Sequence, residues 1–133
     1  CKHFPAAFPD GMGVAKRDPD VLIAGVVNDQ DQAVDSGFVN GSKVKFDYGD
    51  CIDLYAPGLD ILSTGAPGPS TFPKNGGETV SSGTSLAAAH VTGVVALYLE
   101  RFPGSTPNNI KREMRQQATG GVVQGAIAPG ALL

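Results

Sequence analysis

The hydrophobic pattern of the first half of the chain predicts short strands separated by turns. Val21 to Asn28 is a continuous apolar run between Asp-rich flanks, which is typical of a strand covered on both faces in a parallel sheet. Shorter strands are predicted at 51–55, which Pro57-Gly58 closes, and at 60–64. Residues 1–20 are rich in Pro, Ala and Asp and 65–79 in Gly and Pro, and both are expected to be loop. Residues 29–50 are polar and contain Gly, with short extended pieces such as Val44 to Phe46.

The second half of the chain changes to helix patterns. Residues 85–101 contain good helix formers, lack proline and are apolar nearly all round, which predicts a helix buried in a core. Four hydroxyl residues near its start are candidates for the N-cap: Ser81, Ser82, Thr84 and Ser85. A second, amphipathic helix is predicted from Pro107, a residue favoured in the first helical position, to about Ala118.

Strands followed by long helices are typical of an α/β layer architecture with a mostly parallel sheet. The pattern predicts about three strands, and a parallel sheet with so few strands leaves an edge strand without a neighbour. We therefore expect residues 1–133 to be one part of a larger fold. The start on Cys1 instead of Met suggests a processed or cleaved product.

Composition excludes several classes of partner. The net charge is -3 and no run of Lys or Arg stands out, so neither nucleic acid nor an anionic membrane is an expected partner. The longest apolar stretch, 86–99, is interrupted by His90, Thr92 and Gly93 and is too short to cross a bilayer.

The two cysteines leave two interpretations open. A bridge between Cys1 and Cys51 would suit a secreted protein. Alternatively, Cys51 is a buried free thiol and Cys1 pairs with a cysteine on a segment outside this sequence. Spacing in the sequence does not decide between them, because it does not give the distance between the two residues.

Residues 83–93 carry the candidate chemistry. Ser85 stands where a Gly-bearing loop enters a predicted buried helix. A helix N-terminus presents unpaired backbone N–H groups and a positive dipole end, which favour a developing oxyanion. Gly83 permits close approach of a substrate backbone. On these features alone, most such serines are only helix caps.

The residues themselves narrow the choice. The stretch resembles the serine signature of the subtilase family of serine proteases, Gly-Thr-Ser-x-Ala-x-Pro-His-Val-x-Gly, with matches at 83, 84, 85, 87, 90, 91 and 93. Ala89 departs from the family, which usually has Pro there. Because Ala is an excellent helix former, this change should preserve the helix.

Other segments resemble the family in the same order. Residues 48–58 are similar to Asn-Tyr-Gly-x-x-Val-Asp-Ile-x-Ala-Pro-Gly from its second position on, with Asp47 in place of the usual Asn. Residues 4–9 look like the segment that walls the specificity pocket, and 21–27 like the strand after it. Pro129 to Leu133 resembles the last strand of fungal, proteinase K-like members.

The resemblance implies that residues 1–133 are the C-terminal portion of a subtilase catalytic domain. It implies a three-layer α/β fold with a mostly parallel sheet and a buried central helix that starts at the catalytic serine. The implied activity is that of a secreted serine endopeptidase without an organic cofactor. Ser85 would be the nucleophile and Thr84 would support the oxyanion, while His3, Pro5, Ala6 and Gly83 would contact substrate.

The catalytic Asp and His and the oxyanion Asn of the family precede this region and are absent here. His90 lies about 140° around the helix axis from Ser85 and is expected to be a packed histidine bonded within the core. The motif-like Asp35-Ser36-Gly37 lies in a variable loop, out of order for the catalytic Asp. Because a serine without a general base is a poor nucleophile, the chain alone should be inactive. Its expected partner is the N-terminal part of the same protease.

Two other functions remain as alternatives. In the first, the chain is a non-enzymatic secreted binding or effector protein that has kept half a protease fold. A Rossmann-like domain with Ser85 as a cap is disfavoured by the matches in several segments, and no Gly-x-Gly-x-x-Gly follows a strand. Some subtilases bind calcium, but no loop here has calcium-ligand spacing. Backbone carbonyls near Ala6 and Phe8 would offer only a weak site.

Overall fold

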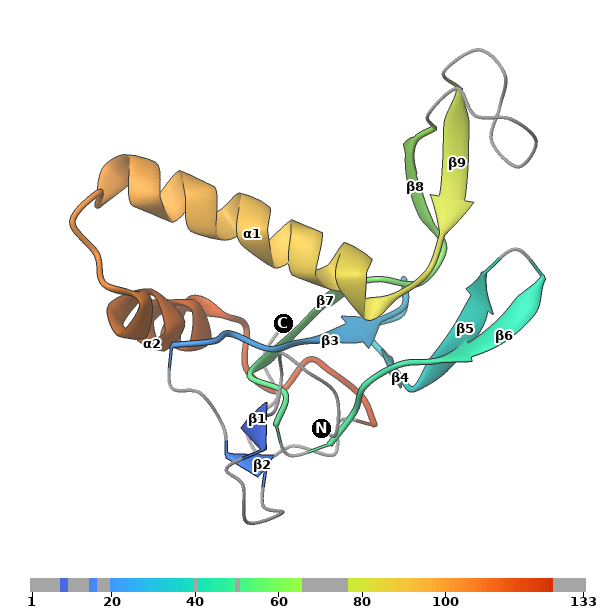
Figure 1. Cartoon of the computed structure of the whole chain (residues 1–133), viewed down its shortest axis with the longest axis horizontal. Helices are drawn as coiled ribbons and strands as arrows, with labels where there is room; N and C mark the ends of the chain where they lie inside the picture. The colour runs from blue at the N-terminus through green and yellow to red at the C-terminus, as the bar shows by residue number, and fades with distance from the viewer. Residues whose placement is uncertain are drawn as a thin grey trace.

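The computed structural model describes residues 8–9, 15–16, 20–39, 41–49, 51–65 and 77–125. Figure 1 shows a helix lying across a small sheet, a second helix at one end of it and hairpins projecting from it. The strands are β1 (Phe8–Pro9), β2 (Ala15–Lys16), β3 (Ala24–Val27), β4 (Ala33–Val34), β5 (Ser36–Val39), β6 (Ser42–Lys45), β7 (Leu54–Pro57), β8 (Ile61–Thr64) and β9 (Glu78–Ser81). The helices are α1 (Thr84–Arg101) and α2 (Pro107–Gln117).

The central sheet has the order β4-β3-β7. β3 runs parallel to β7, with Ala24 opposite Leu54, and antiparallel to β4, with Val26 opposite Val34. All four residues of β3 are buried, which confirms the strand predicted from the apolar run at 21–28. The predicted α/β class is confirmed as well. The described part of this sheet holds one parallel and one antiparallel pairing, however, so a mostly parallel sheet is not seen there.

Alternating side chains of β3 and β7 make two apolar layers. On the α1 face, Ala24, Val26 and Ala56 pack with Ala87 of the helix and with Phe46. On the opposite face, Ile23, Val27, Ile52 and Tyr55 form a second cluster. Because successive residues of a strand point to opposite faces, β3 and β7 each contribute residues to both clusters.

Two antiparallel hairpins extend from the central sheet, β5–β6 and β8–β9 (Figure 1). β8 was predicted, but β9 lies in and beyond the region expected to be loop, and that expectation is wrong for 78–79. In β9 the exposed Glu78 and Val80 alternate with half-buried neighbours. Four residues are too few for such alternation to stand out in a sequence.

Helix α1 begins and ends as predicted but is not buried as predicted. Ala87 is its buried residue, whereas Val94 is 55% and Leu97 69% exposed. Val94 is seven residues after Ala87 and lies on the same side of the helix, where it lines a groove with residues of β7 and α2. Among the described residues, therefore, even the sheet side of α1 is only partly covered. The predicted capping is also wrong, because Gly83 is the N-cap and no side chain caps this described helix start.

Helix α2 is held to the sheet by a buried carboxylate. Its predicted start is confirmed, with Pro107 first and the Thr106 side chain accepting a hydrogen bond from the Asn109 N–H. The fully buried Asp53 carboxylate lies 3.1 Å from Lys111 Nζ and accepts a 2.9 Å bond from the Ile23 N–H. Lys111 also donates to the Val21 carbonyl at 2.6 Å. These bonds join α2 to the segments that enter β3 and β7.

Cys51 is disulfide-bonded in the structure. The interpretation of Cys51 as a free thiol is therefore wrong. Cys1, the other cysteine of the sequence, lies outside the described residues.

Candidate active site

Ser85 is the second residue of α1 and is exposed. The Leu86 and Ala87 N–H groups both donate to the Gly83 carbonyl, at 3.1 and 3.3 Å. Helix geometry therefore leaves the N–H groups of Thr84 and Ser85 without carbonyl partners inside the helix. Together with the positive end of the helix dipole, they form a place where negative charge is stabilised beside the Ser85 hydroxyl.

The segment before Ser85 is fixed to the central sheet through Gly58. The Gly83 N–H donates to the Gly58 carbonyl at 2.7 Å, and the Gly58 N–H donates to the Val27 carbonyl at 3.2 Å. Ala87, two residues after Ser85, is fully buried against the sheet. Hydrogen bonds on one side of Ser85 and apolar packing on the other therefore fix the start of the helix.

The glycine at position 58 is required by this close approach. A Cβ atom there would lie 2.9 Å from the Gly83 carbonyl oxygen and 3.0 Å from Val26 Cγ2. Both distances are shorter than ordinary van der Waals contacts, and the Gly83 oxygen belongs to the backbone that leads into α1. The turn after β7 and the start of α1 are thus in direct steric contact.

We expect Gly58→Ala to lower the free energy of unfolding by about 1–3 kcal/mol, the usual cost of overpacking. The displaced Gly83 carbonyl should also lower any reactivity of Ser85 toward a serine-directed reagent. Gly104→Ala is the matched control, because a Cβ at Gly104 meets nothing within 4 Å. Denaturant unfolding of the two variants compares them directly, and equal stability would contradict this account of the turn.

The structure brings together three of the predicted site residues, Gly83, Thr84 and Ser85, at the start of α1. The predicted substrate-binding residues His3, Pro5 and Ala6 lie outside the described residues. So do Pro129 to Leu133, and the proteinase K-like assignment stays a prediction.

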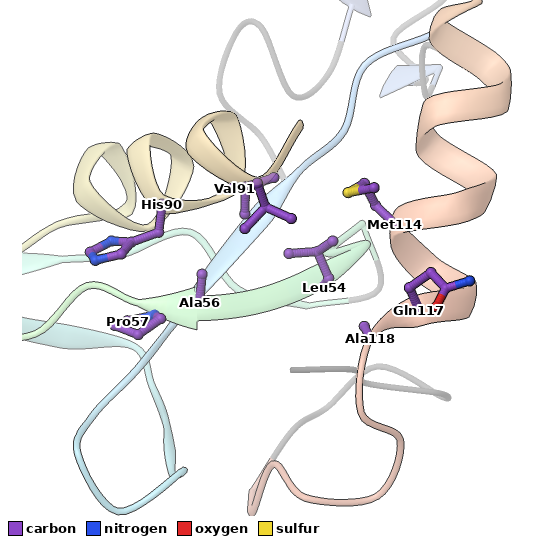
Figure 2. A pocket seen from close by; sticks show the side chains of 9 residues that line it. Leu54, Ala56, Pro57, His90, Val91, Met114, Gln117 and Ala118 are labelled. Carbon is purple, nitrogen blue, oxygen red and sulfur yellow. The ribbon is translucent and has the colours of Figure 1, made fainter. Parts of the chain in front are cut away.

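His90 is not the packed core histidine that was expected. Its side chain is exposed, and Nδ1 donates to the Leu86 carbonyl of the same helix at 2.9 Å. Figure 2 shows it at the edge of an apolar groove of about 360 Å³. The groove is lined by Leu54, Ala56, Pro57, His90, Val91, Val94, Met114, Gln117 and Ala118. His90 lies about 140° around α1 from Ser85 and lines this groove between α1, β7 and α2, so it is not in place to act as the base for Ser85.

Asp35 and Ser36 form a local contact and no catalytic pair. Ser36 Oγ donates to Asp35 Oδ1 at 3.1 Å, and the Asp35 carbonyl accepts from the Phe46 N–H. Both contacts belong to the β5–β6 hairpin and its connection. Within the part of the chain that the structure describes, therefore, no histidine hydrogen-bonds Ser85.

Two contacts at the site were missed from the sequence. Gly58 was interpreted only as the end of a strand, and Ser82 only as an N-cap candidate, whereas the Ser82 side chain hydrogen-bonds Asp60. Nothing in a single sequence signals a bond between residues 22 positions apart.

The described ranges contain no cluster of three or more His, Cys, Asp or Glu side chains suited to a metal ion. Neither described helix is long and apolar enough to cross a membrane.

Comparison with known proteins assigns the family. The model of the subtilase family, Peptidase_S8, matches residues 3–128, which is nearly the whole chain. This chain belongs to the subtilase family. The exposed serine at the start of α1 lies within the matched residues.

Similar proteins support the assignment and are longer than this chain. The extracellular serine proteinase of Thermus sp. (strain Rt41A) is 39% identical over 65% of this chain and 20% of its own length. Rat proprotein convertase subtilisin/kexin type 9 is 34% identical over 84% of the chain and 14% of its own length. The chain therefore spans a fifth or less of these two relatives.

Solved structures show the same relation. A cold-adapted subtilisin-like serine proteinase superimposes with a TM-score of 0.66 and 29% identity, over 86% of this chain and 36% of that one. Fervidolysin from Fervidobacterium pennivorans, a keratinolytic enzyme related to subtilisin, gives a TM-score of 0.55 and 26% identity over 16% of its length. The subtilase fold is thus seen in this chain over about a third of a solved family member.

Proposed function

We propose that this chain is the nucleophile-bearing part of a subtilisin-like serine endopeptidase, with Ser85 as the nucleophile. The observation that carries the proposal is the position of Ser85. It is exposed at the N-terminus of an 18-residue helix, within the signature of a family to which the chain belongs. An exposed hydroxyl beside unpaired helix N–H groups suits attack on a carbonyl carbon.

The chemistry assigned to the chain's own residues is limited and specific. Ser85 Oγ attacks the carbonyl carbon of a peptide bond, and its proton passes to a histidine. The negative charge that develops on the carbonyl oxygen is stabilised at the N-terminus of α1, where the Ser85 N–H lies and where Thr84 gives further support. The peptide C–N bond then breaks, and the amine product leaves with the proton that the histidine returns. Water hydrolyses the resulting acyl-enzyme, which releases the acid product and restores the Ser85 hydroxyl. Gly83, which has an extended backbone, leaves room for the substrate chain, and His3, Pro5 and Ala6 are assigned to the pocket wall.

The histidine, the aspartate that orients it and the oxyanion asparagine are assigned to the N-terminal part of the same protease. The exposed apolar side of α1, with Val94 and Leu97, supports this. Exposure of such side chains to water is unfavourable by roughly 25 cal/mol per Å² of apolar area, so a covering layer would be stabilising. The chain alone should have no useful peptidase activity.

Location and cofactors follow from the same proposal. One relative is named an extracellular serine proteinase, and a disulfide at Cys51 suits an oxidising compartment. We therefore propose secretion. Proteins or peptides are the proposed substrates, and no organic cofactor is assigned.

Hydrolysis of fluorescently labelled casein tests the proposal. The isolated chain should release no label above background. The completed protein, which is the chain together with its N-terminal part, should release label, and a fluorophosphonate should block this release. Digestion by the isolated chain would contradict the need for a second part. No digestion by the completed protein would favour the alternative, a secreted binding or effector protein with a protease-like fold.

A further inference from the structure

The Ser82 hydroxyl is a buried polar group with two hydrogen bonds to one residue. Ser82 is 6% exposed. Its Oγ donates to Asp60 Oδ1 at 3.1 Å and accepts from the Asp60 N–H at 2.9 Å. The hydroxyl's proton and one of its lone pairs are therefore both directed to Asp60. A buried hydroxyl bonded in this way is costly to disrupt, because its loss leaves polar groups without partners.

Asp60 adopts a backbone conformation that serves this contact. Its φ angle is 53°, in the left-handed region that residues other than Gly, Asn and Asp seldom adopt. In this conformation both its N–H and its carboxylate reach Ser82. Glycine would adopt the conformation more easily but would offer no carboxylate.

These bonds act on the segment that leads into Ser85. Ser82 immediately precedes Gly83, whose N–H is bonded to Gly58 in the same turn after β7. Residues 82 and 83 are therefore tied to the turn at 58–60 by a side chain and by the backbone. The turn itself is hydrogen-bonded to β3, because the Gly58 N–H donates to the Val27 carbonyl. This places the start of α1 relative to the sheet at two adjacent residues.

We propose that Ser82 and Asp60 are positioning residues for the nucleophile, which act through the Gly83 to Ser85 segment and not by contact with substrate. The proposal rests on the proposed function of Ser85. If the pair is lost, the Gly83 carbonyl and the first N–H groups of α1 gain freedom, and Ser85 with its oxyanion site occupies the reactive geometry for less of the time. Small displacements of this kind reduce catalysis more than they reduce binding.

Kinetics of the intact protein on a peptide substrate test the proposal. Ser82→Ala should lower kcat/KM by about tenfold, mostly in kcat, the size expected when a buried hydrogen-bonded hydroxyl is removed. Ser82→Thr, which keeps the hydroxyl, should stay within about threefold. The control is Ser63→Ala, at an exposed serine on β8, the strand that follows Asp60. Its kcat/KM should equal that of the natural protein.

Substitutions at Asp60 separate the carboxylate from the backbone strain. Asp60→Gly relieves φ but removes the carboxylate acceptor, and should lower kcat/KM by less than Ser82→Ala does, because the backbone N–H of residue 60 still donates to Ser82 Oγ. Asp60→Asn keeps an acceptor oxygen and should largely preserve it. The double variant Ser82→Ala with Asp60→Gly should be no worse than Ser82→Ala alone, because Ser82→Ala already removes both hydrogen bonds of the pair. Additive losses would overturn the idea of a pair.

Amide hydrogen exchange gives a measurement that does not depend on activity. In Ser82→Ala the Gly83 amide should exchange about tenfold faster, while the Ala118 amide at the end of α2, bonded to Met114, should not change. Unchanged exchange at Gly83 together with unchanged kcat would overturn the proposal. If the natural protein hydrolyses no peptide, the proposed function fails, and exchange at Gly83 still decides whether the pair fixes this segment.

Discussion

Ser85→Ala should abolish peptide hydrolysis by the completed protein without changing its fold. Ser85 is exposed, so the loss of one hydroxyl leaves no cavity and no buried polar group unpaired. The expected decrease in kcat is about 10⁶-fold, a magnitude that comes from subtilisin itself and not from this structure. Hydrolysis and circular dichroism, measured on the same preparation, check both halves of the expectation.

The control for Ser85 is Ser42→Ala, at an exposed serine on β6. It should leave kcat and the unfolding midpoint unchanged. If Ser85→Ala kept more than about a hundredth of the activity, far above the residual catalysis expected without a nucleophile, another group would be the nucleophile. Ser85 would then be only an exposed residue at a helix start.

Asp53→Ala should lower the free energy of unfolding by about 3–5 kcal/mol, the cost of breaking a buried ion pair from one side. The Asp53 side chain is fully buried and 3.1 Å from Lys111 Nζ. It also accepts a hydrogen bond from the N–H of Ile23, the residue immediately before β3. Without the carboxylate, that N–H loses its acceptor, and the largely buried Lys111 ammonium group loses a charged partner and keeps the neutral Val21 carbonyl. Guanidinium chloride unfolding of the completed protein measures the difference.

Two further variants isolate the role of the charge at Asp53. Asp29→Ala, at an exposed residue between β3 and β4, should stay within about 0.5 kcal/mol of the natural protein. Adding Lys111→Met to Asp53→Ala should recover part of the lost stability, because the ammonium group without its charged partner is then gone. A double variant no more stable than Asp53→Ala would mean that packing, and not the buried charge, sets the cost.

The elements that the sequence predicted well are those with a local cause. β3 follows from an uninterrupted apolar run, and the bounds of α1 and α2 follow from helix formers, a Pro in the first position and the stop at 102–104. β7 lies three residues later than the predicted start at 51. The prediction began the strand at Cys51 and Ile52, which are apolar, but Asp53 after them uses its side chain to bind the start of β3.

The features that were missed depend on contacts between distant segments. The outer side of α1 is apolar in sequence, which predicted burial, yet burial needs a second layer and the described residues supply one only beneath the helix. β9 exists through its pairing with β8. Ser85 was found through a motif, whereas the contacts of Gly58 and of Asp60 with the segment before it arise only when the β7 turn meets the start of α1.

The central claim is that Ser85 is an activated nucleophile in the completed protein. Treatment with a fluorophosphonate, followed by intact-mass spectrometry under denaturing conditions and peptide mapping, tests it most directly. We expect one adduct, on Ser85 of this chain, and a second polypeptide or a longer chain that carries the remaining catalytic residues. A single species of unlabelled chain would contradict the claim and leave Ser85 as a serine at the start of a helix.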